Sequence, residues 1–332
     1  MPLRRLTLRL WAAAALAACL GAPAGAEETD VRGTWSFTLE NDVIAGTDQD
    51  YSNGVLVSYI GPDDALGMIG RTVKTGLFWL DPDATWRMSY GLGQNMYTPQ
   101  DTSRRIPDPE DRPYAGWLYG SVGISADARN PDGSPRQLDV LALEIGVVGP
   151  ESFAEETQKY VHRQINSEKP EGWNSQLHNE VAFRLLYERN WRASDKWNLP
   201  LVPLEGDVTP NVGLALGTLA TYAAAGVSFR IGEELEDDYG PPRVRPALGS
   251  PGFFESVDGF AWYIFFGAQG RAVARDLFVE GNTFKDSPGV DLVPWQLDVQ
   301  AGLALQFGRF EIAFTHVLRS PQHEEKGRWN RF

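Results

Sequence analysis

The sequence has little cysteine, an excess of acid over base, and no long apolar run beyond its N-terminus. One cysteine stands among 332 residues, and the formal net charge is −14. This charge disfavours nucleic acid as a partner, because a polyanionic backbone is bound through basic residues. Beyond the N-terminal segment, no stretch reaches the roughly 18 uncharged apolar residues that a membrane-spanning helix requires. We therefore expect neither a transmembrane helix nor a nucleic-acid partner.

The N-terminal segment, residues 1–26, has the features of a secretory signal peptide. Arginines precede a short apolar core at 10–20, and the small residues at 24–26 form a cleavage site. The sequence LAAC also fits a lipoprotein cleavage site, which leaves a lipid-anchored Cys19 open. Cleavage after 26 removes three arginines and the cysteine, so the net charge becomes −17 and no redox chemistry is needed outside the cytoplasm. We expect residues 27–332 to form one domain.

What the chain has in abundance is alternation of apolar and polar residues. In residues 295–307, WQLDVQAGLALQF, every second side chain is apolar, and most of the others are polar or small. Successive side chains of a strand point to opposite faces, so this run predicts a strand with one apolar face. It is longer than the 9–11 residues that a tilted membrane strand needs.

The same alternation predicts eleven strands, many with aromatic residues near their ends, as in the interfacial girdles of membrane barrels. Their expected ranges are 33–40, 52–60, 86–97, 114–126, 137–148, 179–191, 208–218, 220–231, 259–273, 294–307 and 309–318. A secreted soluble β-sandwich, whose strands also alternate, is the alternative. Strand length and aromatic content favour an all-β fold, an antiparallel transmembrane β-barrel. Such a barrel must close, because lipid does not tolerate open sheet edges.

The connections between the predicted strands differ in character. With a periplasmic N-terminus, the connections 41–51, 98–113 and 149–178 lie outside the cell, and they hold the three most unusual polar stretches of the first half. The links 61–85 and 232–258 are then periplasmic, although short turns are typical there.

The first unusual stretch is ENDVIAGTDQDYSNGV, residues 40–55. Its clustered carboxylate, amide and hydroxyl oxygens suit a hard cation such as calcium, but the spacing is not that of an EF-hand loop. An Asx-rich hairpin loop has the same composition. Spacing alone leaves both interpretations open.

The second stretch, residues 94–120, places Arg104, Arg105 and Arg112 in an otherwise acidic chain. Guanidinium groups bind phosphate and carboxylate oxygens in a bidentate manner. The alternative is that these arginines pair with the acids of the same stretch.

The third stretch, residues 147–173, predicts a helix between two strands. Ser152 and Glu155 have capping-box spacing, and the helix should extend to about Asn166 before a proline ends it. We expect a short helical insertion near 150–168.

His162 lies in the last turns of this expected helix, and Glu168 follows six residues later. A histidine with a nearby carboxylate can act as a general base with a fixed tautomer. A surface histidine on a polar helix is the alternative.

Four motifs make the chain resemble the outer-membrane lipid A 3'-O-deacylase family, the LpxR-like proteins. They are ENDxxxxTDxDYSNG, QNMYTP followed by DRPYAGWLY, LxxxIGVVGP, and VHRQINSEKPEGWxxQLHNE. The resemblance runs from about Gly33 to Leu318. It implies a twelve-stranded barrel in the outer membrane of a Gram-negative bacterium, with its site facing the outer leaflet. It further implies calcium-dependent hydrolysis of an ester-linked acyloxyacyl chain of lipid A or lipopolysaccharide by a monomer.

The resemblance also implies roles for individual residues. These are Asp42 for the metal, Asn41, Ser52, His162 and Glu168 for catalysis, and Arg104, Arg105 and Arg112 for the sugar-phosphate head group. His162 is the expected base that activates water. The family's hydroxyl position, a threonine in some members, is Ser52 here.

One part of the chain departs from the family. The C-terminal sequence RSPQHEEKGRWNRF places polar residues where a last strand should alternate, so we expect that strand to be poor or truncated.

Two alternative functions remain at this stage. One is a serine-type outer-membrane lipid hydrolase, with Ser52 as nucleophile and His162 as its base. The other is a barrel without enzymatic activity, either a porin or a lipopolysaccharide-binding protein.

Overall fold

The structure is a computed structural model. It describes residues 33–41, 50–62, 66, 75–165, 169–192, 197–198, 203–233, 235, 259–307, 310–324 and 329–331. The predicted signal peptide and Cys19 lie outside these residues.

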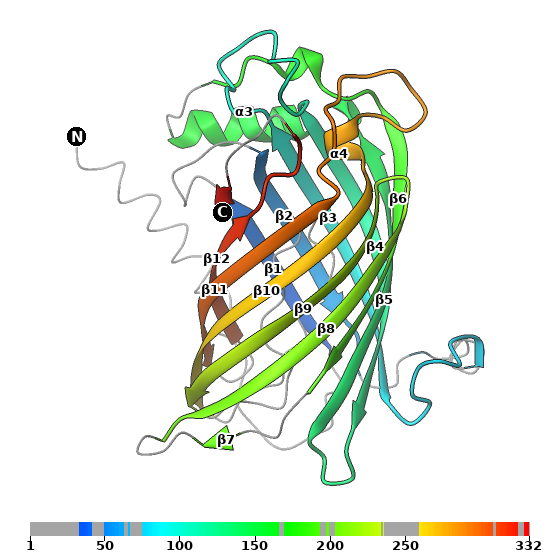
Figure 1. Ribbon diagram of the computed structural model, residues 1–332, viewed down its shortest axis with the longest axis vertical. Coiled ribbons are helices and arrows are strands. Elements are labelled where there is room, and N and C mark those ends of the chain that lie inside the picture. Colours follow the sequence, from blue (N-terminus) through cyan, green and yellow to red (C-terminus); the bar gives the residue numbers. More distant parts are fainter. Residues whose placement is uncertain are drawn as a thin grey trace. The chain divides into compact units, whose positions relative to one another are not determined.

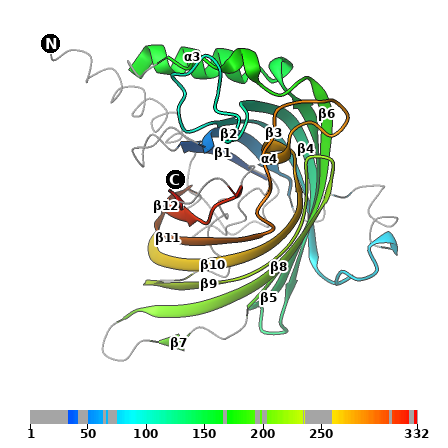
Figure 2. The ribbon, with the colours of Figure 1, turned by 45° about the horizontal axis from the view of Figure 1, so that its top comes forward.

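Eleven long strands form one antiparallel sheet in which neighbours follow chain order. They are β1 Thr34–Asn41, β2 Asp50–Ile60, β3 Thr85–Thr98, β4 Ala115–Arg129, β5 Pro135–Val148, β6 Glu180–Trp191, β8 Glu205–Gly217, β9 Ala220–Glu233, β10 Phe260–Asp276, β11 Trp295–Phe307 and β12 Phe310–Arg319. Figure 2 shows this sheet curling round on itself. The expected all-β antiparallel architecture and its eleven main strands are confirmed.

Two further strands are very short. The two-residue β7 Trp197–Asn198 pairs with β8, and β13 Asn330–Arg331 pairs with Leu318 and Arg319 at the end of β12. In the described part of the chain, β13 is the one strand after β12. The expected poor last strand stays a prediction, because residues 325–328 and 332 lie outside the described residues. Within the same residues, no pairing joins β1 to β12.

The two faces of the sheet differ in polarity. The outward face exposes large apolar side chains on nearly every strand, among them Leu92, Val122, Leu143, Ile145, Val181, Phe183, Leu185, Leu214, Phe266 and Phe314. On the inward face, buried polar and charged residues predominate. A soluble sandwich has the opposite distribution, with apolar side chains inside and polar ones outside. The distribution found here is typical of a barrel whose outer wall contacts lipid.

Ion pairs hold the inward face together. Arg184 Nε donates to Glu144 at 2.8 Å, Arg230 Nε donates to Asp207 at 3.0 Å, and Arg319 Nε donates to Asp298 at 2.8 Å. These side chains are almost fully buried, and each arginine faces a carboxylate, as buried charges require.

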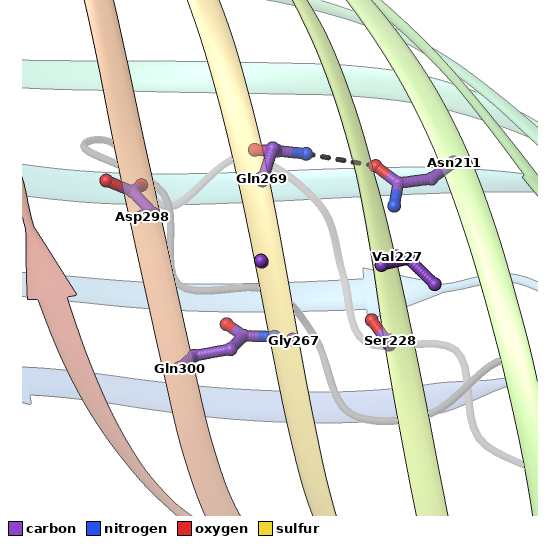
Figure 3. Close-up of a pocket in the computed structure, with 8 residues that line it drawn as sticks. Asn211, Val227, Ser228, Gly267, Gln269, Asp298 and Gln300 are labelled. Atoms are coloured by element: carbon purple, nitrogen blue, oxygen red, sulfur yellow. Dashed lines mark hydrogen bonds between the residues drawn. The ribbon is translucent and has the colours of Figure 1, made fainter.

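A small pocket lies on the same inward face, where β8, β9, β10 and β11 meet (Figure 3). Amide side chains line much of it, and Gln269 Nε2 donates to Asn211 Oδ1 at 3.0 Å. At this pocket the inner wall therefore offers hydrogen-bonding groups.

Four of the helical segments lie at one end of the strands, at the rim where β3 ends and β4 begins (Figure 1). They are α3 Ala154–Ile165, α4 Leu277–Glu280, and the 3-10 turns Pro150–Ser152 and Trp173–Ser175. No helix among the described residues is long and apolar enough to cross a membrane. The three polar connections of the first half all leave from this rim, as the strand order predicts.

The expected capping box at Ser152 is wrong, and α3 begins at Ala154. Phe153 has φ 58° and ψ 21°, a left-handed conformation that separates the turn at Pro150–Ser152 from α3. The Ser152 hydroxyl donates to the Gly149 carbonyl instead of capping the helix. The insertion itself, near 150–168, is confirmed by α3.

Candidate functional site

A row of paired residues crosses the first four strands close to the α3 rim. Asn41 pairs with Asn53, Asn53 pairs with Met96, and Met96 pairs with Gly116. Because opposite residues of paired strands share a face, this row belongs to one face of the sheet. Residues an even number of positions apart in a strand share a face, so Met96 lies on the face of Leu92 and Gly116 on the face of Val122. Because Leu92 and Val122 are exposed, this is the outward face.

Strand β2, which contributes Asn53 to this row, has a bulge at Ser52. In the pairing of β2 with β3, Tyr51 lies opposite Tyr97 and Asn53 lies opposite Met96, so Ser52 has no opposite residue. A bulge re-aims a side chain and interrupts pairing, and bulges are frequent next to active sites. Two of the predicted site positions, 41 and 52, therefore lie at the same irregular strand end.

The start of α3 packs closely onto the outward face. A Cβ added at Gly116 would lie 2.1 Å from Ser152 Oγ and 2.3 Å from Ala154 Cβ, so only glycine permits this approach. On the neighbouring strand, Gln94 Nε2 donates to the Ser152 carbonyl at 2.6 Å. The insertion is thus fixed to β3 and β4 at its N-terminal end.

The helix carries His162 along the row. Ala154, Gln158 and His162 are spaced by four residues, and all three are buried. Figures 1 and 2 show α3 lying crosswise over the strands, from β4 towards β1. Eight residues of helix advance about 12 Å, and the three strand spacings from Gly116 to Asn41 amount to about 14 Å. By this estimate the helix is long enough for His162, which is 5% exposed, to extend from β4 towards β2 and β1.

A polar and aromatic cluster supports this face of the helix. Trp173 Nε1 donates to Gln158 Oε1 at 2.7 Å, and the Trp173 ring packs on Tyr114 with centroids 4.9 Å apart. Met96 and Ala154 complete the cluster. The sequence interpretation missed Gln158, although its position one turn before His162 on the same face was a usable signal.

The loop that carries Arg104 and Arg105 joins the segment that follows α3. Glu171 N donates to the Thr102 carbonyl at 2.9 Å, and the backbone of Arg104 lies against Gly172. Both arginines are exposed. Arg104 pairs with Asp108 at 2.7 Å, which is the alternative considered for it. A half-exposed pair of this kind is weak, so it does not prevent Arg104 from binding an anion.

Arg112 occupies a different environment from Arg104 and Arg105. It is 1% exposed, it donates to Gln322 Oε1 and to the Phe278 carbonyl, both at 3.3 Å, and it lies over the Tyr97 ring. Burial lowers the pKa of Arg112, and the charge of Asp276 acts in the opposite direction. Arg112 joins its loop to α4 and the C-terminal segment, and its role at the head group stays a prediction.

Two predicted site residues, Asp42 and Glu168, lie outside the described residues. Of Asn41 and Ser52, the structure gives the backbone positions. Within the described part of the chain, no group of three His, Cys, Asp or Glu side chains could hold a metal ion. The expected calcium site therefore stays a prediction.

An apolar outer wall, an ion-paired inner wall and polar loops at one rim define the class of the protein as an outer-membrane β-barrel. The family model described as "Outer membrane protein LpxR" matches residues 10–332. The chain belongs to the LpxR family, so the resemblance found in the motifs is confirmed, and with it the assignment to outer-membrane lipid A deacylases, which are ester hydrolases.

A solved structure has the same fold. LpxR from Salmonella typhimurium superposes with a TM-score of 0.65 at 17% sequence identity, over 87% of this chain and 88% of that chain. No curated protein matches the sequence.

Proposed function

We propose that this chain is a calcium-dependent esterase that removes an ester-linked acyloxyacyl chain from lipid A at the outer leaflet, with His162 as the general base. The observation that carries the proposal is the path of α3. It starts at Gly116 on the outward face and runs towards β1, which supports a site that combines His162 with Asn41 and Ser52. A site on the outer wall at this rim is open to a lipid that lies beside the barrel.

The residues at the strand end suit a hard cation. Asn41, Asp42 and Ser52 offer only oxygen donors, which calcium prefers, although magnesium and manganese accept the same donors. The bulge at Ser52 supports this fit because it interrupts the regular backbone pairing of β2 with β3 at this position. When bound, such an ion would polarise the ester carbonyl and neutralise the developing oxyanion.

The remaining roles belong to side chains of the chain itself. His162 takes a proton from the attacking water, and Glu168 orients its imidazole or adds negative charge near the metal. General-base catalysis contributes about 10²–10⁴-fold to the rate. Arg104 and Arg105 offer exposed guanidinium groups to the phosphates of the head group.

The test uses the purified protein in vesicles of defined lipid A. His162→Ala should lower the rate of fatty-acid release by about 10²–10⁴-fold. His178→Ala is the matched control, because His178 is an exposed histidine of the same rim, and it should leave the rate unchanged. EGTA should abolish release, and added calcium should restore it. If His162→Ala keeps more than half of the wild-type rate, His162 has no part in the mechanism.

Replacement of Ser52 separates the two ester-hydrolysis mechanisms. With water as nucleophile, Ser52→Ala should retain a reduced, calcium-dependent rate, whereas a serine nucleophile would leave none. Trapping of an acyl group on Ser52 of the wild-type protein, seen by mass spectrometry, would replace the water mechanism with the serine one.

A further inference from the structure

A short segment between β2 and β3, residues 75–84, lies on the outer wall at the end of the sheet opposite α3. Leu77, Leu80 and Ala84 pack on Trp86 of β3 and on Ala126 of β4. Trp86 and Ala126 are paired and have the outward parity of exposed Leu92 and Val122. The segment therefore covers the lipid side of the wall and not its lumen.

Polar contacts fix the segment to β5 and β6. Arg189 Nη2 donates to the Trp79 carbonyl at 3.2 Å, and Arg189 Nε donates to Asp139 at 2.6 Å. Arg136 pairs with Asp81. Because backbone and side chains of the segment are both held, its aromatic residues have a defined position.

The segment lies where the apolar outer wall ends. Along the outward face of β6, the exposed apolar residues Val181, Phe183 and Leu185 are followed by Tyr187 and Arg189. A change from aliphatic to aromatic and charged residues marks the boundary between hydrocarbon and head groups in membrane barrels. The segment covers this boundary.

Two of its exposed residues are aromatic. Phe78 is 83% exposed and Trp79 is 48% exposed, and their rings meet edge to face with centroids 5.5 Å apart. Exposure of two adjacent aromatic rings to water is unfavourable, whereas aromatic side chains are stable at the interface of a bilayer.

We propose that residues 75–84 are a membrane foot, in which Phe78 and Trp79 insert into the phospholipid leaflet beside the barrel at the end opposite α3. The orientation of the proposed function makes this the inner leaflet of the outer membrane. The foot extends the lipid-facing surface beyond the strands. It therefore sets how deeply the barrel lies in the membrane, and with that the position of the α3 rim relative to the outer leaflet.

The test uses nitroxide spin labels on single cysteines in phosphatidylethanolamine and phosphatidylglycerol vesicles. The chain has one native cysteine, Cys19, and removal of residues 1–26 leaves none. The labelled variants are Phe78→Cys, Leu143→Cys on the lipid-facing wall, and Asp132→Cys in the exposed turn between β4 and β5. Accessibility to oxygen is compared with accessibility to a water-soluble nickel chelate.

We expect the ratio of oxygen to nickel accessibility at position 78 to be several-fold higher than at 132 and to approach the ratio at 143. A ratio at 78 equal to that at 132 overturns the proposal, whether the aromatic rings then face water or another protein. Trp79→Cys repeats the measurement if the label at 78 disturbs folding. The readout does not involve catalysis, so its failure is distinct from failure of the proposed deacylation.

Discussion

At the scale of single residues, Phe153 has an unusual backbone conformation. Among the described residues it alone has a positive φ without being glycine, and its ring is exposed. The left-handed conformation costs an L-residue roughly 1–2 kcal/mol, and glycine avoids that cost. The conformation lets the chain turn from Pro150–Ser152 into α3, so it sets the direction in which the helix leaves β4.

Phe153→Gly should therefore unfold at a temperature equal to or above that of the wild type. Phe153→Val, whose β-branched side chain tolerates the left-handed region poorly, should unfold below it. The midpoint of thermal unfolding followed by circular dichroism checks this order, and the reverse order would contradict the strain at Phe153.

At the scale of elements, the approach of α3 to β4 decides where His162 lies. Gly116→Ala would bring a methyl group against Ser152 and Ala154. We expect this variant to keep its barrel and to lose most of its deacylase activity, because the start of α3 must move.

Gly120→Ala is the matched control on the same strand and face. A Cβ there would meet only the Gly91 carbonyl, at 3.9 Å. Fatty-acid release in lipid A vesicles measures both variants, and folded barrel is quantified by its mobility on unheated gels. Equal activity of the two variants would show that α3 does not depend on this contact.

The elements also show what could be predicted from the sequence. Period-two alternation predicted a strand at 294–307, and β11 spans Trp295–Phe307. The agreement is close because one face of this strand contacts lipid along its whole length. Prediction of β10 stopped at 273, whereas the strand continues to Asp276 past a bulge between Val273 and Arg275 that interrupts the period. Local patterns describe regular strands and miss the bulges within them.

The candidate site was predictable in a different way. Motifs predicted His162, Asn41 and Ser52 as site residues, which stays a prediction, but nothing local indicated that α3 crosses the strands. That arrangement depends on the register of four strands and on the close approach at Gly116, both of which are tertiary properties. The same reason explains why burial of Arg112 could not be foreseen from its exposed-looking loop.

At the scale of the whole molecule, buried ion pairs connect the strands across the inward face. Arg184 and Glu144 are both nearly inaccessible to water. Arg184→Met leaves the carboxylate of Glu144 buried without this partner, which should cost about 3–5 kcal/mol. The temperature at which the folded band disappears from gels should fall accordingly.

The double variant Arg184→Met with Glu144→Leu removes both charges at once. It should be clearly more stable than the single variant, because no uncompensated charge remains. Identical melting of the single and double variants would contradict a penalty for the unpaired carboxylate of Glu144.

The whole account depends on a lipid ester being hydrolysed at the α3 rim. Mass spectrometry of lipid A from Gram-negative cells that produce this chain tests that claim most directly. We predict loss of one ester-linked acyloxyacyl group, which His162→Ala prevents and His178→Ala does not. Lipid A of unchanged mass in cells with folded barrel in the outer membrane would contradict the account.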